Sequence, residues 1–559
     1  MMLKRTVSNI LSIEIWHEIF TYLSAVDIFN AFTNINSYFN SILSNYNQHY
    51  INFQSCLKTH FDLICCHIQP NQILSLTLSN SNDTPGQFEL FTSKFNIKSL
   101  SCLHSLTLIE IDPTCLIPLI ISLNEIQNHI TSFSIINCFD SYNLNSTELA
   151  IMQLFFRQLK KLVISNARYI TRNNNQLVNL RHLSIQQCNM NDLEHIFQLT
   201  PSLYSLELTI CRESGFWIPV DDIPLKLKRL VLNTHIQMSM IDIKEFLSKT
   251  SQLKYFELQT NIRDLIFNGD EWISLVENLI TFDFKFRISK AIIHPNAFIN
   301  SFRTTFWIEE KRWFIAYDEQ QLLVYTVPRF VEKCAEYHIY SSFEPPSHTT
   351  IDINTPFFYD NINELTINQC LCRSLPFYRF TNITRLSFSG EIPFDQLHSV
   401  VDLSNVYYLK LPEIISIKDL KRIFPNVFPR VQHLYLRSLP IGHSWRHSII
   451  MKQIRILHIQ TINCASQLCQ QFPNIERLYV DCVKSYRQIR WIIHRLKPQL
   501  SYMSLSWLNN QPKQLSFRLF YKWLKKQQQY QTYRTHIGSF SCIYLWINNE
   551  LNEEYTKYI

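Results

Sequence analysis

A short apolar motif recurs sixteen times along this chain of 559 residues and constrains its fold more than any other feature. The motif is apolar-x-x-apolar-x-apolar, as in Leu103-x-x-Leu106-x-Leu108. Consecutive copies begin 21 to 30 residues apart, except for one gap of 83 residues. Such regular self-similarity is typical of repeat architectures, in which neighbouring units share a core. The copies begin at Ile73, Leu103, Ile130, Leu159, Leu180, Leu203, Leu227, Leu253, Leu279, Ile362, Ile383, Val406, Val431, Ile454, Ile475 and Leu500.

The spacing and one further position resemble the leucine-rich repeat, whose units run about 20–29 residues. Five residues after the second apolar site that family places Asn or Cys, whose side chain can satisfy backbone groups of the loop leaving the strand. The chain has a thiol or an amide there in five units, at Cys138, Cys188, Cys211, Asn261 and Cys370. We expect these cysteines to serve the structure rather than catalysis.

The repeats predict an α/β solenoid. No single unit can bury its own apolar face, so stacked units would share one core, with parallel strands on a concave face and helices on the convex face. The clearest return segment has its apolar residues on one helical face, with arginines off it. These apolar residues are Ile489, Ile492, Ile493 and Leu496. A conventional α/β domain, with helices on both sheet faces, fits so short and regular a motif less well.

The 83-residue gap divides the predicted solenoid into two blocks. The first block covers residues 73–290, and the second covers residues 362–559 and ends in a C-terminal cap. Residues 291–361 would form an insertion.

A β-hairpin is the simplest structure for this insertion. Residues 306–316 and 322–327 are rich in β-forming residues and are separated by a polar connection. We expect Trp307 and Trp313 to pack internally rather than to form a binding patch.

Residues 1–53 follow a different pattern, that of three short amphipathic helices. An apolar stripe through Leu11 and Ile15 defines the first helix, and Ser24-x-x-Asp27 is a capping box that opens the second. Three short helices cannot hide so much apolar surface among themselves, so part of it is expected to face another protein. Residues 54–72 would connect this domain to the repeats.

This N-terminal segment resembles the F-box, by which substrate receptors dock onto the Skp-type adaptor of cullin–RING ubiquitin ligases. It departs from the family pattern at Ser12, where proline is usual, and at Phe39, where tryptophan is frequent. A simple N-terminal cap of the solenoid is the alternative. The adaptor-binding residues that the resemblance implies are Leu11, Ile15, Ile19, Phe20, Leu23, Asp27, Ile28, Phe32, Ile35 and Phe39.

The third and fifth motif positions should face the concave side, and their character changes along the chain. They are mostly small in the early units, as at Ser75 and Thr77, and become aromatic or basic from the twelfth unit onward. Tyrosine and arginine concentrate binding energy because they combine a large contact area with a polar end. Cross-strand packing of these aromatics is the alternative. The predicted target-binding residues are Tyr408, Lys410, His433, Tyr435, His458, Arg477, Tyr479 and Tyr502.

Charge indicates the same region. Residues 421–535 carry 19 Lys and Arg against 2 Asp and Glu, within an overall net charge of +7, so the rest of the chain is net acidic. A basic concave face that carries tyrosines suits an acidic or phosphorylated segment of an unknown protein. RNA is the less favoured partner, and part of the charge is expected on solvated helices.

Composition excludes several classes of function. None of the 6 glycines lies within forty residues of another, which rules out the clustered glycines of phosphate-binding loops. The 15 cysteines include no CxxC pair, so we expect neither a metal site nor a cofactor. An odd number of thiols without an export signal favours a reducing cytoplasmic or nuclear setting. No apolar run approaches the roughly 18 residues of a membrane-spanning helix.

The sequence therefore predicts a non-catalytic substrate-recognition subunit of a cullin-type ubiquitin ligase. No nucleophile–base pair or carboxylate constellation suggests an enzyme. The alternative is a ligase-independent repeat scaffold that binds acidic protein or RNA.

Overall fold

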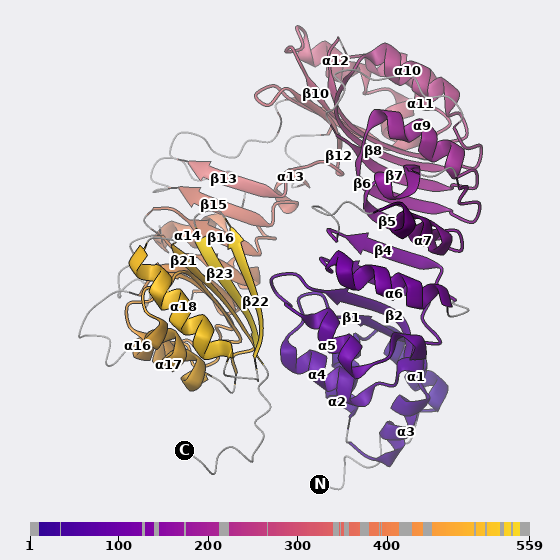
Figure 1. Ribbon diagram of the computed structural model, residues 1–559. Helices are drawn as coiled ribbons and strands as arrows, with labels where there is room; N and C mark the ends of the chain where they lie inside the picture. The colour runs from indigo at the N-terminus through magenta and orange to yellow at the C-terminus, as the bar shows by residue number, and fades with distance from the viewer. Residues whose placement is uncertain are drawn as a thin grey trace, which may run out of the picture.

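Two sheets of mainly parallel strands form most of the structure, which is a computed structural model of the chain (Figure 1). The structure describes residues 11–33, 35–125, 129–138, 145–172, 175–211, 223–264, 266–338, 346, 348–351, 357–368, 379–390, 392, 394–412, 427–439, 450–496, 499–508, 511–525, 530–537 and 540–547.

The first sheet runs in chain order through ten parallel strands and ends in three antiparallel ones. Its order is β1 (His49–Asn52), β2 (Ile73–Ser79), β3 (Ser105–Ile109), β4 (Ser132–Ile136), β5 (Lys161–Asn166), β6 (His182–Cys188), β7 (Ser205–Ile210), β8 (Arg229–Met238), β9 (Tyr255–Ile262), β10 (Thr281–Ile288), β12 (Leu323–Val327), β11 (Phe314–Asp318) and β14 (His348–Thr349).

The second sheet repeats this plan, with eight parallel strands followed by an antiparallel pair. Its order is β13 (Cys334–His338), β15 (Glu364–Asn368), β16 (Arg385–Phe388), β17 (Tyr408–Lys410), β18 (His433–Ser438), β19 (Ile456–Thr461), β20 (Arg477–Cys482), β21 (Tyr502–Leu508), β23 (Phe540–Ile547) and β22 (Tyr530–Ile537).

Helices connect many of the strands and follow the outer side of the first sheet in Figure 1. The α-helices are α1 (Ile13–Thr21), α2 (Ala25–Phe32), α3 (Ser37–Asn45), α4 (Lys58–His67), α5 (Gln87–Lys94), α6 (Pro113–Glu125), α7 (Ser146–Phe156), α8 (Arg168–Thr171), α9 (Met190–Leu199), α10 (Met240–Lys249), α11 (Gly269–Val276), α12 (Pro295–Ser301), α13 (Phe357–Asp360), α14 (Phe394–Val400), α16 (Ala465–Gln471), α17 (Tyr486–Leu496) and α18 (Gln511–Lys525). Short 3-10 turns span Pro70–Gln72, Ile97–Ser99 and Leu403–Asn405.

The repeat pattern correctly predicted these strands. All sixteen motif copies coincide with strands, and those within one sheet pair in parallel. Alternate strand residues such as Leu106 and Leu108 are almost fully buried in a core shared by successive units. Burial of one such side chain contributes about 1.5–3 kcal/mol, which no isolated unit could obtain. The described chain is therefore an α/β solenoid-like fold.

The polar position after the strand also has a structural role in the described units. Cys138 is buried, and the backbone N–H of Ile111 donates to its Sγ at 3.3 Å. Burial raises the pKa of the Cys138 and Cys188 thiols to about 12, so both remain protonated at neutral pH. The amide of Asn261 donates to a backbone carbonyl of the preceding unit at 3.3 Å. Cys370 lies outside the described residues.

The first sheet begins earlier than the sequence indicated. β1 lies inside the predicted helical domain of residues 1–53, and α4 lies inside the predicted connector of residues 54–72. The apolar motif was not recognised in this unit for one reason. A register shift places buried His49 opposite Ile73, at the first motif position, where the other units have an aliphatic residue.

The insertion contains the predicted hairpin, formed by antiparallel β11 and β12, and β12 also pairs with the last parallel strand of the first sheet. Residues Phe306–Lys311 form a π-helical turn, so the prediction of a β-run over 306–316 was wrong at its start. Trp307 and Trp313 are buried, as expected.

The second sheet also starts before its predicted first unit at residue 362. β13 pairs in parallel with β15 and places Ala335 beside Leu365 and Tyr337 beside Ile367. Small or polar-ended residues at these two positions conceal the unit from the apolar motif.

The C-terminal end matches the expectation of a helical return segment. The four apolar residues predicted to share one face of α17 are buried, whereas its arginines are exposed. β22 and β23 then add an antiparallel hairpin to the last parallel strand, as β11 and β12 do in the first sheet.

Candidate interaction surfaces

The N-terminal helices begin at polar caps. Ser24 caps α2, since the Asp27 backbone N–H donates to its Oγ at 3.1 Å. Asn36 caps α3 by accepting from the Phe39 N–H at 2.9 Å. Ser12 precedes α1 in extended backbone, but its side chain forms no hydrogen bond of this kind.

The three helices enclose a small aromatic core. Trp16 lies 5.1 Å from Phe39 between ring centres, and Phe20 lies 5.2 Å from Phe32. Phe20, Ile28 and Phe39 are 1%, 2% and 4% exposed. Their assignment as adaptor-binding residues is therefore corrected: these side chains hold the helices together, as amphipathic helices require, and cannot contact a partner directly.

Other predicted adaptor-binding residues remain accessible. Ile15, Leu23 and Ile35 are 47%, 37% and 53% exposed, Leu11, Ile19 and Phe32 are half-buried, and Asp27 is exposed. The prediction omitted Tyr22, which is 81% exposed. At 100° per residue, Ile15, Ile19 and Tyr22 share one side of α1, opposite its buried stripe. We call Ile15, Ile19 and Tyr22 the α1 apolar face; Leu23, after α1, and Ile35, before α3, are further accessible apolar residues of this domain.

The helical domain is firmly attached to the first sheet. The side-chain amide of Gln72 donates to the carbonyls of Leu43 and Ser44 at 2.9 and 3.0 Å, at the end of α3. Phe29 of α2 belongs to the core of the first sheet and stacks on His49, with ring centres 5.1 Å apart. The α1 apolar face therefore has a set orientation relative to the solenoid.

The predicted target-binding residues form two neighbouring rows on the second sheet. Register places Tyr408, His433, Ile456, Arg477 and Tyr502 in one row. The next row holds Lys410, Tyr435, His458 and Tyr479.

Side chains in these rows stack on one another. Ring centres are 4.5 Å apart for Tyr408–His433 and again for Tyr435–His458. Lys410 lies 5.1 Å from the Tyr435 ring centre, close enough for a cation–π contact. The pKa of His433 is lowered to about 4, mainly by burial and to a lesser extent by nearby cations. Cross-strand packing of the aromatic side chains, which was the alternative to a binding surface, is therefore present along these rows.

Part of the predicted target-binding surface is occupied by the chain's own N-terminal unit. The Arg477 guanidinium donates to the carbonyl of Ser55, and the Tyr479 hydroxyl donates to Asp83 at 3.3 Å. Tyr502 is 2% exposed in a cluster that includes Tyr544. The prediction that Arg477, Tyr479 and Tyr502 bind a target is therefore wrong, because these side chains contact other parts of the same chain and do not form a free surface.

The C-terminal hairpin completes this internal contact. Trp546 of β23 is fully buried in the core of the first sheet, 5.1 Å from the Phe61 ring of α4, and its indole N–H donates to the Cys56 carbonyl at 3.3 Å. Lys58 lies 5.4 Å from the Trp546 ring centre. The two halves, which face each other in Figure 1, are thus joined where the C-terminal sheet meets the first repeat unit. We call this contact the closure.

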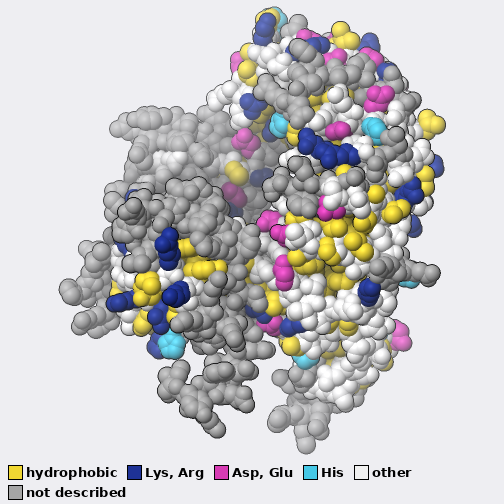
Figure 2. Space-filling model, in the orientation of Figure 1, with side chains coloured by type: hydrophobic (Ala, Val, Ile, Leu, Met, Phe, Trp, Pro, Cys, Tyr) yellow, Lys and Arg dark blue, Asp and Glu magenta, His cyan; other side chains and the backbone are white. Residues whose placement is uncertain are grey.

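Basic side chains gather over the C-terminal helices, in agreement with the charge pattern. In Figure 2, Lys and Arg cluster over the region of α17 and α18, whereas the other half of this face shows Asp and Glu interspersed with Lys and Arg. The basic residues of α17 include Arg487, Arg490 and Arg495, which are exposed.

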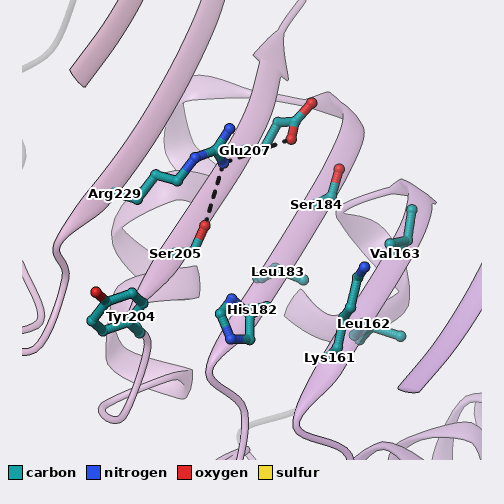
Figure 3. A pocket seen from close by; sticks show the side chains of 10 residues that line it. All are labelled: Lys161, Leu162, Val163, His182, Leu183, Ser184, Tyr204, Ser205, Glu207 and Arg229. Carbon is teal, nitrogen blue, oxygen red and sulfur yellow. Dashed lines mark hydrogen bonds and ion pairs between the residues drawn. The ribbon is translucent and has the colours of Figure 1, made fainter. Parts of the chain in front are cut away.

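A hollow of about 440 Å³ lies on the open face of the first sheet, over β5–β8 (Figure 3). Lys161, His182 and Arg229 line it, together with hydroxyls and Glu207. Arg229 lies 3.4 Å from Ser205 Oγ and 3.9 Å from a Glu207 oxygen. The three basic residues occupy the third motif position of their units. The sequence prediction did not include them, because it placed the binding surface in the strongly basic residues 421–535.

No family model matches the chain, and no curated protein matches it significantly. Among the described residues, no helix is both long and apolar enough to cross a membrane. Within the same ranges, no group of three or more His, Cys, Asp or Glu side chains is arranged to hold a metal ion.

Proposed function

We propose that this chain is the substrate-recognition subunit of a Skp–cullin–F-box ubiquitin ligase, built from an F-box followed by leucine-rich repeats. The α1 apolar face carries the proposal. Large apolar side chains exposed together on a small helical domain are a mark of a protein–protein interface.

The departure from the F-box pattern at Phe39 is compatible with this function. Phe39 replaces the frequent tryptophan but fills the centre of the helical core, against Trp16 and Phe32. Docking would therefore depend on α1 and on the loop residues Leu23 and Ile35, and not on Phe39 itself.

The receptor would contribute proximity rather than chemistry. An adaptor bound at α1 would connect the solenoid to the ligase, and a target bound on the solenoid would hold its lysines near the catalytic partner. Because Gln72 and Phe29 fix the helical domain to the first sheet, the distance between the two sites would be well defined. Such a ligase subunit would act in the cytoplasm or nucleus.

Capture of a purified Skp-type adaptor by the full-length chain tests the proposal. Ile15→Asp and Leu23→Asp should each weaken capture at least tenfold, because a charge would be desolvated at the interface. Ile241→Asp on α10 is the matched control, since Ile241 is 71% exposed and remote from α1. Equal capture by all three variants would reject the proposal. Phe20→Asp is unsuitable, because a charge in the helical core would unfold the domain.

The basic C-terminal block favours a second candidate, a ligase-independent scaffold for acidic protein or RNA. Lys410, which is exposed on the second sheet, is the residue to reverse. Under this alternative, affinity for a polyanion should fall steeply with salt and with Lys410→Glu, and adaptor capture should be absent.

A further inference from the structure

The hollow over β5–β8 has the dimensions of a short extended peptide. Register aligns Lys161, His182, Ser205 and Arg229 in one row across four neighbouring strands. Neighbouring strands lie about 4.8 Å apart, so the row spans roughly 14 Å. An extended peptide covers this span with about four residues.

The row is positively charged. Lys161 is exposed, and no described carboxylate forms an ion pair with it. Arg229 contacts Glu207 at 3.9 Å, but both side chains remain about half exposed. Burial, together with the charges of Lys161, Arg181 and Arg229, lowers the pKa of His182, which indicates a local excess of positive charge.

Carboxylates occupy the neighbouring row. Register places Glu207, Glu257 and Asp283 two residues further along their strands. Glu257 pairs with Arg329 at 2.9 Å, whereas Glu207 is 55% exposed beside the hollow. A continuous phosphate backbone would meet these negative charges, so the pattern favours a peptide with localised acidic side chains over a nucleic acid.

We propose that the hollow over β5–β8 binds an extended acidic segment of a protein partner, with Lys161 and Arg229 as its cationic contacts. Tyr204 and the Ser184 hydroxyl, which also line the hollow, supply further hydrogen-bonding groups. This inference rests on the proposed function, since it specifies the chemistry of the target. It also moves the main target site from the second sheet, which the closure partly covers, to the first.

The test is fluorescence anisotropy with the purified full-length chain and a fluorescein-labelled Glu-Ser-Ser-Ser-Glu peptide, whose two separated carboxylates match the length of the row. Lys161→Glu and Arg229→Glu should each weaken binding about fivefold, and the double variant should weaken it at least tenfold. Lys244→Glu makes the same charge change on the exposed convex side of α10 and should alter affinity less than twofold. Lys161→Gln with Arg229→Gln provides a milder double variant, and thermal melting verifies that each variant folds.

Three outcomes would overturn the proposal. The first is unchanged affinity in the folded double variants. The second is a loss caused by Lys410→Glu but not by Lys161→Glu, which would assign the peptide to the second sheet. The third is displacement of the labelled peptide by a uridine oligonucleotide as effectively as by unlabelled peptide of the same net charge, which would indicate a nucleic-acid site. Adaptor capture by Lys161→Glu separates the two hypotheses, because it should stay normal whether or not the hollow binds the peptide.

Discussion

The two sheets have the same strand geometry but use their open faces differently. The first sheet presents small, polar and basic side chains and leaves an open hollow over β5–β8. The second presents stacked aromatic rings, and its last strands are covered by the first repeat unit. A repeat backbone thus sets where side chains stand, and the residue types at two motif positions decide whether a face closes on its own chain or remains open.

Alternation within one strand illustrates how the closure forms. Ile543, Leu545 and Ile547 of β23 enter the core of the second sheet. Trp546 lies between them in sequence and therefore points to the opposite side, where it enters the core of the first sheet. One strand thereby belongs to two cores.

The largest expected effect comes from breaking this link. Trp546→Ala should lower the free energy of unfolding by about 3–5 kcal/mol, because it leaves a cavity between the two halves. Urea denaturation of full-length protein measures the loss. Trp491→Ala on α17 is the control, since Trp491 is 43% exposed and should cost less than about 1 kcal/mol. Similar losses in both variants would show that the closure contributes little stability.

Lowering the pH should reduce the stability of the first sheet more than that of the second, because each contains a histidine with a lowered pKa but the one in the first sheet is more deeply buried. His49 of the first sheet is 1% exposed, and neither of its ring nitrogens has a described hydrogen-bond partner. Burial lowers its pKa from 6.5 to about 4. The unfolded chain thus binds a proton that the folded chain excludes, so stability is fully present above about pH 6.5 and falls as the pH approaches 4. The loss should reach roughly 3 kcal/mol near pH 4 and about 2 kcal/mol at pH 5.

Unfolding midpoints at pH 7.5 and pH 5 test this expectation. His49→Phe should reduce the acid-induced loss, whereas His494→Phe on exposed α17 should not. His433 of the second sheet has a similarly lowered pKa but is more exposed, so its substitution should have a smaller effect. An unchanged pH dependence in His49→Phe would contradict the burial argument.

The smallest effect is expected from the polar contacts of the closure. Tyr479→Phe removes the hydroxyl that donates to Asp83 and should cost about 1 kcal/mol. Arg477→Ala, which removes the contact with Ser55, should cost a similar amount. If these contacts hold the halves together, the double variant should show a larger radius of gyration by small-angle X-ray scattering. Tyr407→Phe, at a site 46% exposed, is the control, and an equal radius in all proteins would assign the closure to Trp546 alone.

The sequence predicted most strands because their signal is local. Apolar residues at three fixed positions are sufficient to recognise a unit, and every unit found in this way is a strand. The missed units, at β1 and β13, have His49 and Ala335 where the motif expects larger aliphatic residues. Both stand at the start of a sheet.

The candidate sites were less predictable, because apolar residues of an amphipathic helix pack and bind by the same chemistry. The sequence placed Phe20 and Ile15 in one group, but only the packing of α1 on its neighbours shows that Phe20 faces inward and Ile15 outward. Likewise, the residue type of Tyr479 suggested binding, and the fold determined that it binds the same chain.

The sequence by itself determined the periodic strands, the helical N-terminus and the uneven distribution of charge, since each depends on residues near one another in the chain. Only the tertiary structure decided that the C-terminal sheet meets the first unit, because that contact joins Arg477 to Ser55, over 400 residues apart. It also decided which basic residues line a hollow, since Lys161 and Arg229 come together only through the stacking of four units.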